Sequence, residues 1–342
     1  MGLLKITGEI ALKQFWPDNG SGSASDGDTA KVTVDANAFS YQDEPGQPFQ
    51  ITHALDEAEA ISSIGEKNKV IKSGGIKVRF QGIDAPELHY KLFNYDTFNF
   101  TPAQKHAFAI YNKPEYRQPF GETATVKLTE LLAQNGTPVV PCTVTTAVNK
   151  PHEVVDVYGR LIGDLHVVIQ GNEINLNRWM VEEGWAYPTF YASMSEQEIE
   201  ALLAAAEKGK QQPNRLWQKN LQTYIGALND KLIFRGKDIV FDPLTDLGKV
   251  LMPKLFRRLV EWTLLRDSGV LTNSFHNFLI GKKDECFMTK DFLAEGPSAA
   301  PLHYLSDFVT PFGKIKSEPQ ELVFREKSSA LIGPNNQPVT SW

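Results

Sequence analysis

The chain has only two cysteines, Cys142 and Cys286, among its 342 residues. So few cysteines exclude a disulfide framework or a zinc cluster, and we expect two buried thiols in preference to one long-range bridge. No apolar run approaches the roughly 18 to 20 residues that a membrane span needs. The start, Met1 to Glu9, lacks the basic and apolar segments of a secretory signal. As written, the sequence predicts a cytoplasmic protein, and a processed N-terminus would make a secreted or periplasmic location the alternative.

Excess positive charge is also missing. The chain has 35 Lys and Arg residues against 41 Asp and Glu residues, which gives a formal net charge of −6. Proteins that coat nucleic acid without specificity are usually strongly basic, so that class is disfavoured. An enzyme that handles phosphodiesters with a metal ion and a few arginines remains compatible with this charge.

The order of segments predicts a mixed β+α fold. Five short segments have the alternating pattern of half-buried strands: 3–14, 29–40, 75–83, 139–145 and 161–169. Three helices are expected over 122–134, 174–183 and 193–210, with Ser193 or Ser195 as the cap of the third. Five strands with three helices fit a small barrel.

Two polar segments interrupt this pattern, and a different region follows it. We expect insertions at 41–75, with a short helix near 55–62, and at 88–119, with a small helix at 103–112. Residues 1–219 are predicted to form one domain. Residues 220–342 are predicted to form a smaller α+β region of unknown function, with a helix at 254–266 and a connection at 220–242.

Three short stretches supply the residue types that phosphodiester hydrolysis needs: Asp26-Gly-Asp-Thr29, Arg79-Phe-Gln-Gly-Ile-Asp-Ala-Pro-Glu87 and Asp156-Val-Tyr-Gly-Arg160. Asp28 and Asp84 are carboxylates at strand ends, and such oxygen ligands suit calcium or magnesium. Glu87 offers a further carboxylate to activate water. Arg79 and Arg160 are bidentate donors matched to phosphate oxygens.

The spacing within the second stretch makes a geometric prediction. Arg79 and Asp84 are five positions apart, so a regular strand would point them to opposite faces. Gly82 lies between them and is a natural place for a bulge or a sharp bend. We therefore expect the strand to be broken at Gly82.

Taken in order, these stretches closely resemble the staphylococcal nuclease (thermonuclease) family. The likeness continues into 175–187 and ends near Asn214-Arg-Leu-Trp217, so that it spans about residues 3–219 apart from the two insertions. The resemblance implies a five-stranded OB-type barrel with three helices, and a calcium-dependent nuclease that cleaves DNA or RNA to 3′-phosphate products. By motif position, Arg79, Glu87 and Arg160 would be catalytic, and Asp28, Asp84 and the Ala85 carbonyl would hold Ca²⁺.

Aromatic residues near these motifs are candidates for stacking on the bases of single-stranded or frayed substrate. They are Tyr158, Tyr187, Phe190 and Tyr191. Packing in the core is an equal alternative for the last three. His89 and Asp26 lie close to the motifs but are expected to be a loop residue and a turn residue.

Two other functions remain open at this point. Barrels of this family also serve as non-catalytic modules that bind nucleic acid or protein, although such modules typically lose acidic or arginine positions that are present here. An enzyme restricted to short oligonucleotides is the second alternative. In the C-terminal region, Arg257 and Arg258 could face a phosphate backbone, but a solvated basic edge of an amphipathic helix is the favoured interpretation.

Overall fold

The computed structural model describes residues 1–15, 25–56, 58–61, 67–92, 95–113, 115–219, 248–326 and 329–342. The expected connection at 220–242 lies outside these residues. The chain divides into two compact units, and each is built from separate segments of the sequence. The first contains Met1–Ile83, Thr125–Met180 and Glu326–Trp342, and the second contains Asp84–Ala124 and Val181–Arg325.

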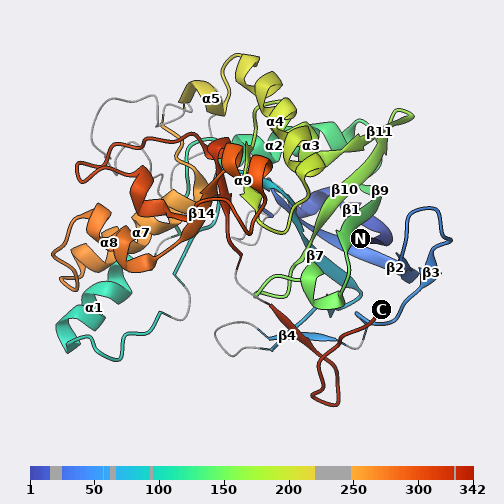
Figure 1. Ribbon diagram of the computed structural model, residues 1–342, viewed down its shortest axis with the longest axis horizontal. Helices are drawn as coiled ribbons and strands as arrows, with labels where there is room; N and C mark the ends of the chain where they lie inside the picture. The colour runs from blue at the N-terminus through green and yellow to red at the C-terminus, as the bar shows by residue number, and fades with distance from the viewer. Residues whose placement is uncertain are drawn as a thin grey trace. The chain divides into compact units, whose positions relative to one another are not determined.

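A closed ring of five hydrogen-bonded strands forms the centre of the first unit (Figure 1). In ring order the strands are β1(Gly2–Ala11), β2(Thr29–Gln42), β7(Gly75–Phe80), β10(Leu161–Ile169) and β9(Val139–Val148). The β7–β10 pair is parallel and the other four pairs are antiparallel. These are the five segments in which the sequence predicts strands.

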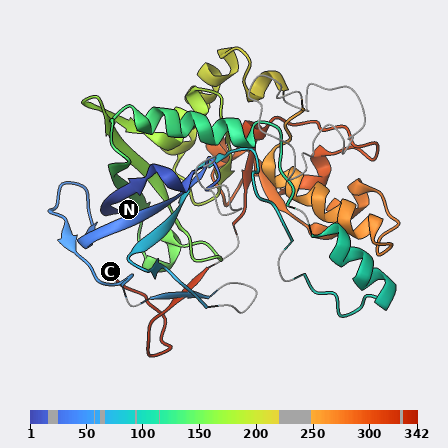
Figure 2. The same cartoon turned by 180° about the vertical axis from the view of Figure 1, so that it is seen from behind.

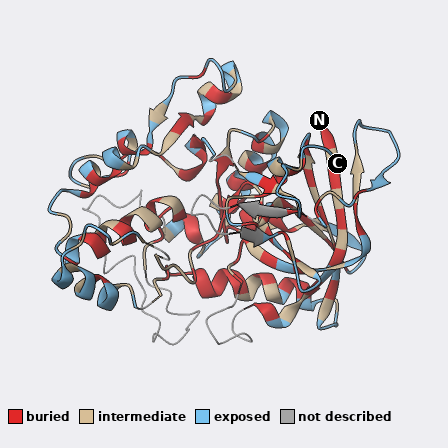
Figure 3. Ribbon diagram, turned by 90° about the horizontal axis from the view of Figure 1, so that it is seen from below, coloured by how far each residue is buried: buried red, intermediate tan, exposed pale blue. Residues whose placement is uncertain are grey.

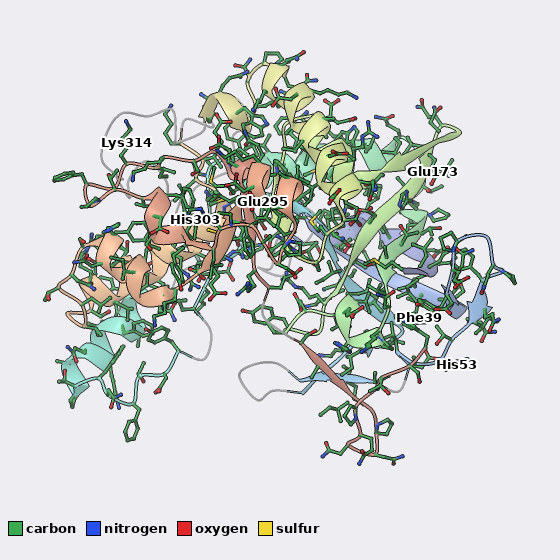
Figure 4. The ribbon with its side chains drawn as sticks, in the orientation of Figure 1. Phe39, His53, Glu173, Glu295, His303 and Lys314 are labelled. Atoms are coloured by element: carbon green, nitrogen blue, oxygen red, sulfur yellow. The ribbon has the colours of Figure 1, made fainter. Side chains whose placement is uncertain are left out.

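Alternating burial explains why these strands form a ring with a filled interior. Along β1, β9 and β10, buried residues alternate with more exposed ones, as Figure 3 shows by colour. Leu4, Ile6 and Ile10 of β1 are 0% exposed. Phe39 of β2, labelled in Figure 4, is 3% exposed. Because side chains alternate across a strand, one apolar face of each strand meets the others inside the ring.

Short strands extend the first unit beyond its ring. They are β3(Gln50–Ile51), β6(Ile71–Lys72) and β11(Asn172–Asn175), together with a separate sheet in which β4(Glu59–Ile61) lies between β5(Lys67–Lys69) and β17(Ala330–Ile332). The helix expected near 55–62 is therefore wrong. Its local Ala and Glu content favours a helix, but 59–61 pairs on both sides as a strand, and one partner lies about 270 positions away in the sequence.

The C-terminal residues return to the first unit. Trp342 stacks on Tyr41 of β2, with 4.8 Å between ring centroids, and its Nε1 donates to the Asn149 carbonyl oxygen at 3.0 Å. Figures 1 and 2 both show this red segment next to the blue β4. The last strand of the chain therefore pairs with an element of the 41–75 insertion.

The second unit is built mainly of helices around a four-stranded sheet. Among the described residues, its helices are α1(Pro102–Tyr111), α4(Glu196–Gln211), α5(Leu216–Lys219), α7(Pro253–Asp267), α8(Phe275–Lys282) and α9(Thr289–Glu295). The sheet order is β13(Phe190–Tyr191), β16(Leu322–Phe324), β14(Glu285–Met288) and β15(His303–Tyr304). A 3-10 helix, η5(Leu305–Phe308), follows β15 and another, η6(Pro319–Glu321), precedes β16. Phe108 of α1 shares one apolar cluster with Phe256 and Leu259 of α7, so the 88–119 insertion packs against the C-terminal region.

The chain crosses from one unit to the other within helices and within a strand. Two of these are α2(Gly121–Ala133) and α3(Leu176–Glu182), and β8(Ile83–Asp84) contains a third passage. The part of the chain that the structure describes also contains β12(Tyr187–Pro188), η1(Leu12–Gln14) and η2(Pro151–Val154). Ser195 caps α4 by accepting from the Glu198 amide, as expected. None of the described helices is long and apolar enough to cross a membrane.

Candidate functional site

The residues expected to act together are divided between the two units. The first unit contains Asp28, Arg79, Tyr158 and Arg160. The second contains Asp84, Ala85, Glu87, Tyr187, Phe190 and Tyr191.

Adjacent strands bring Asp28 and Arg79 together. Thr29 at the start of β2 lies opposite Arg79 in β7, so the residue before Thr29 reaches the arginine. Arg79 forms an ion pair with Asp28, and both side chains are largely buried, at 12% and 5% exposed. The Thr29 hydroxyl lies 3.2 Å from Asp28 Oδ1, and Arg79 Nη2 donates to the Ile83 carbonyl at 3.0 Å. These contacts hold a carboxylate and a guanidinium side by side at the end of two strands.

The break expected at Gly82 is confirmed. Strand β7 ends at Phe80, and Gly82 has φ +73°, a left-handed conformation that favours glycine. Asn177, which is 1% exposed, holds this turn in place: its Nδ2 donates to the Gln81 and Gly163 carbonyls at 3.0 and 3.1 Å. The amide side chain therefore ties the turn after Arg79 to the neighbouring strand β10.

The third motif is a turn organised by Asp156. Its Oδ1 accepts from the backbone amides of Tyr158 and Arg160, both at 2.9 Å, and its Oδ2 accepts from Arg160 Nε at 2.8 Å. Gly159 has φ +79°, so glycine suits this position. Arg160 is 31% exposed and lies 5.7 Å from the centroid of the Tyr158 ring, which is itself 59% exposed. The turn thus fixes the arginine at Nε and leaves an aromatic ring next to it accessible to solvent.

In the second unit, Asp84 and Glu87 share one arginine. Arg257 of α7 donates from Nε to Glu87 Oε1 at 2.5 Å and from Nη2 to Asp84 Oδ1 at 3.3 Å. Asp84 is 1% exposed, Glu87 is 12% exposed and Arg257 is 35% exposed. Burial opposes the charge of Arg257, but the Glu87 and Asp84 carboxylates outweigh it and raise the pKa of Arg257 well above its ordinary value. A residue of the C-terminal region therefore supplies positive charge to two largely buried carboxylates.

Gln118 attaches the Glu87 loop to the chain that precedes α7. Its side chain is 0% exposed; Oε1 accepts from the Glu87 amide at 3.1 Å, and Nε2 donates to the Leu251 carbonyl at 2.7 Å. The Gln118 amide also donates to the Glu87 carbonyl at 2.8 Å. A Cβ on Gly121 would lie 2.9 Å from that carbonyl oxygen, so only glycine lets α2 begin this close to the loop.

Arg258, the residue after Arg257 in α7, is bound by acidic groups of the same unit. Arg258 binds both carboxylate oxygens of Asp284, at 2.7 and 2.6 Å, and contacts Glu261 at 3.1 Å. Burial lowers the pKa of Lys254 to about 8, against the opposing effect of Asp284. The favoured interpretation of Arg257 and Arg258 as a solvated basic edge is therefore wrong. Both lie in ion pairs that join α7 to other segments.

The expected stacking residues differ in accessibility. Tyr187 and Phe190 are both 0% exposed. The Tyr187 hydroxyl donates to the Leu216 carbonyl at 3.2 Å, and its ring meets Trp217 edge to face, with 5.0 Å between centroids. Tyr191 is partly buried and packs against the apolar cluster of the second unit. Burial favours the packing alternative for Tyr187 and Phe190, since neither ring face is open to a base, and Tyr158 is the candidate that stays accessible.

The other residues singled out by the sequence have local structural environments. His89 Nδ1 lies 2.9 Å from Glu115 Oε2, and the two side chains are 15% and 20% exposed, so His89 is more buried than a loop position suggests. Cys142 and Cys286 are both free and buried, as expected. Burial raises the pKa of each thiol to about 12.

The donor set expected for calcium has suitable chemistry. Asp28 and Asp84 present carboxylate oxygens and Ala85 a backbone carbonyl, which are the hard ligands that calcium takes. Each carboxylate is buried and paired with an arginine, so each one lies in an environment that provides positive charge. Among the described residues, no group of three or more His, Cys, Asp or Glu side chains lies close enough together to hold a metal ion.

A comparison with protein families supports the resemblance. Residues 77–219 match the family model described as staphylococcal nuclease homologue. The chain therefore contains a staphylococcal nuclease homologue domain. Such a domain indicates a nuclease or a nucleic-acid-binding module, and the family is typically calcium-dependent. No curated protein matches the chain.

The matched range divides the candidate residues. Arg79, Asp84, Glu87 and Arg160 lie within the staphylococcal nuclease homologue domain, whereas Asp28 precedes it and Arg257 follows it. The match begins at Lys77, inside β7, so the first two strands of the ring are supplied by residues outside the matched range.

Sequence reasoning did not identify the supporting residues. Asn177 lies in the stretch that resembles the family helix, and that likeness was the signal that could have found it. Gln118 has no local signal, because its three partners in Glu87 and Leu251 are separated from it by 31 and 133 positions. Arg257 was noticed as a basic residue, but its acidic partners are 170 and 173 positions away.

Proposed function

We propose that this protein is a calcium-dependent nuclease that hydrolyses DNA or RNA phosphodiesters with little sequence specificity. The observation that carries the proposal is the complete set of carboxylates and arginines at motif positions, four of them within the matched domain. An OB-type arrangement of the five-stranded ring would offer a groove to an extended strand of nucleic acid. The family comparison supports nucleic-acid binding in general, and the calcium requirement and the residue roles are our proposal.

Asp28, Asp84 and the Ala85 carbonyl would hold Ca²⁺. When bound, the ion supplies positive charge that neutralises the phosphate. Glu87 would orient a water molecule and accept its proton. Its backbone is held on both sides by Gln118, which suits a carboxylate that must keep one position.

Arg79 and Arg160 would bind the phosphate and stabilise the charge that develops on it. Asp156 fixes Arg160 through Nε, which orients the guanidinium plane, and Asp28 does the same for Arg79. Arg160 would also contact the leaving oxygen, so that the products carry a 3′-phosphate. The exposed Tyr158 ring next to Arg160 would stack on a base, which favours single-stranded or frayed substrate.

A non-catalytic nucleic-acid-binding module is the second candidate, and one observation favours it. Both Asp84 and Glu87 are bound to Arg257, so the acidic residues needed for hydrolysis also serve as an ion-pair anchor for α7. An enzyme that acts only on short oligonucleotides is a narrower form of the first proposal, and cleavage of a dinucleotide compared with a long strand separates the two.

The test is hydrolysis of single-stranded DNA by the full chain, with calcium and with a chelator. We expect cleavage that requires calcium and falls about 10²- to 10⁴-fold in Glu87→Gln and in Arg160→Gln. Glu173→Gln is the matched control, because this carboxylate lies on β11 and is 73% exposed. Comparable rates in either site variant would overturn the assigned roles. Binding of the oligonucleotide without cleavage in any metal would favour the binding module.

A further inference from the structure

Arg257 lies between two acidic side chains, one of which, Asp84, is a proposed calcium ligand. Its Nε and Nη2 each reach a different carboxylate, Glu87 at 2.5 Å and Asp84 at 3.3 Å. Asp84 is shielded from bulk water at 1% exposed, and Glu87 is largely shielded at 12% exposed. Buried carboxylates need positive charge nearby, and Arg257 supplies it here from outside the matched domain.

The backbone of Arg257 is held in place because its helix packs into an apolar cluster. Its helix α7 begins with Pro253 at the first turn and buries Leu255, Phe256 and Leu259 in the apolar cluster of the second unit. The Phe256 ring meets Tyr90, three residues after Glu87, with 6.2 Å between ring centroids. The helix and the acidic loop are thus attached to each other by a ring contact as well as by the ion pair.

The same loop is attached to the start of α7 through Gln118. This fully buried amide bonds the Glu87 backbone and the Leu251 carbonyl at once. The ion pair is therefore one of three links between these segments, so that the guanidinium can leave the carboxylates without releasing the helix.

We propose that Arg257 is a built-in cationic partner of Asp84 and Glu87, and that it competes with the divalent cation for Asp84, the carboxylate that both would bind. A guanidinium bonded to Asp84 would lie within a few ångströms of a divalent ion on the same carboxylate, and like charges at that separation repel. The ion therefore fills the site only when the guanidinium withdraws. The C-terminal region in this way sets the calcium concentration at which the site fills. The inference rests on the proposed function for the identity of the cation.

Calcium binding measured by titration calorimetry tests the competition directly. The wild-type chain is compared with Arg257→Gln, which keeps part of the side-chain volume but removes the charge. We expect Arg257→Gln to bind calcium roughly tenfold to a hundredfold more tightly, since a hydrogen bond to a charged group no longer has to be broken. Adding Asp84→Asn to this variant should abolish the gain.

A thermal measurement separates competition from a merely structural role. Without calcium, Arg257→Gln should unfold at a lower temperature than the wild type, because two largely buried carboxylates lose one partner of opposite charge. Saturating calcium should raise its unfolding temperature by more than it raises that of the wild type. Arg266→Gln is the matched control, since it removes the same charge from the last turn of α7 at a side chain that is 39% exposed. Its calcium affinity should stay within twofold of the wild type.

Equal or weaker calcium binding by Arg257→Gln overturns the inference, as does the absence of calcium binding in every variant. If Arg257→Gln does not fold, Arg257→Lys decides, because one ammonium cannot bond both carboxylates as the guanidinium does and an intermediate gain in affinity is expected. The nuclease assay is read separately. A gain in calcium affinity without any cleavage would refute the proposed function and leave the competition intact, and cleavage with unchanged affinity would do the reverse.

Discussion

Lys254 lies in an environment that works against its own charge. The positive charges of Arg258 and Arg257 act on it from the same helix. The face of the Phe324 ring, whose centroid lies 4.1 Å from the ammonium group, favours the charge and opposes this effect. Burial is the largest cause of its lowered pKa, and Asp284 and Asp84 oppose the shift. The sequence predicted the helix that carries Lys254, but a pKa depends on neighbours from other segments, and periodicity does not reveal them.

This environment predicts a specific dependence of stability on pH. The pKa of Lys254 falls from 10.5 to about 8 on folding. Between these values the unfolded chain binds a proton that the folded chain has lost, so the free energy of unfolding contributed by this residue rises with pH, by up to about 1.4 kcal/mol per pH unit. Below pH 8 the cost of burying the charge is present in full.

Urea unfolding of the wild type and of Lys254→Met at pH 8 and at pH 10 checks this sign. The stability of the wild type relative to the variant should increase between the two values. Lys290→Met replaces an exposed lysine of α9. The difference in free energy of unfolding between this variant and the wild type should be the same at both pH values. A constant difference between wild type and Lys254→Met across the range would contradict the assignment.

At the scale of elements, the turn at Gln81–Gly82 directs the chain from β7 to β8. Both Gly82 and Gly74 have left-handed backbones, with φ +73° and +72°. A non-glycine residue pays roughly 1–2 kcal/mol in this conformation. We therefore expect Gly82→Ala and Gly74→Ala to lose similar stability by denaturant unfolding.

The two variants should differ in nuclease rate. Gly74 lies in the turn between β6 and β7, away from the motif, whereas Gly82 stands between Arg79 and Asp84 in the sequence. Gly82→Ala should lower the rate of DNA cleavage about tenfold or more, because small displacements of catalytic groups are costly. Equal rates in both variants would show that the bend at Gly82 serves stability alone.

Sequence patterns predicted the strands and helices whose formation depends on neighbouring residues in the sequence. The five ring strands, the helix α4 with its Ser195 cap and the helix at 254–266 are all present, the last as α7 over Pro253–Asp267. The break at Gly82 followed from alternation along one strand. The strand β4 could not be predicted from the local sequence, because pairing with β5 and β17 determines its conformation and β17 is distant in sequence. The same reason hid the partners of Arg257 and Gln118.

At the scale of the whole molecule, the boundaries of the two compact units differ from those of the family match. The family match ends at residue 219, where the sequence also predicts a domain boundary, and that boundary stays a prediction. Each unit nevertheless uses residues from both sides of it. In the first unit, β17 completes a sheet with β4, and in the second, Phe108 shares an apolar cluster with residues of α7 and α8.

A fragment of residues 1–219 should therefore fold poorly on its own. It keeps Tyr90, Phe100 and Phe108 but loses the residues of α7 and α8 that cover them in the cluster. We expect this fragment to be less soluble than the full chain and to lack a single cooperative thermal transition. A soluble fragment with a transition as sharp as that of the full chain would show that 1–219 is an independent domain.

The interleaving of segments also constrains how the protein is made. During synthesis, 84–124 leaves the ribosome long before 248–325, its partner in the second unit, and 326–342 emerges after nearly all of the first unit. Pairing across such separations is slow, and unpaired apolar surface invites aggregation. Phe108 and its neighbours therefore stay exposed in the nascent chain until α7 has been synthesised. We expect the yield of folded protein in a cell to depend on translation speed and on chaperones that bind nascent polypeptides.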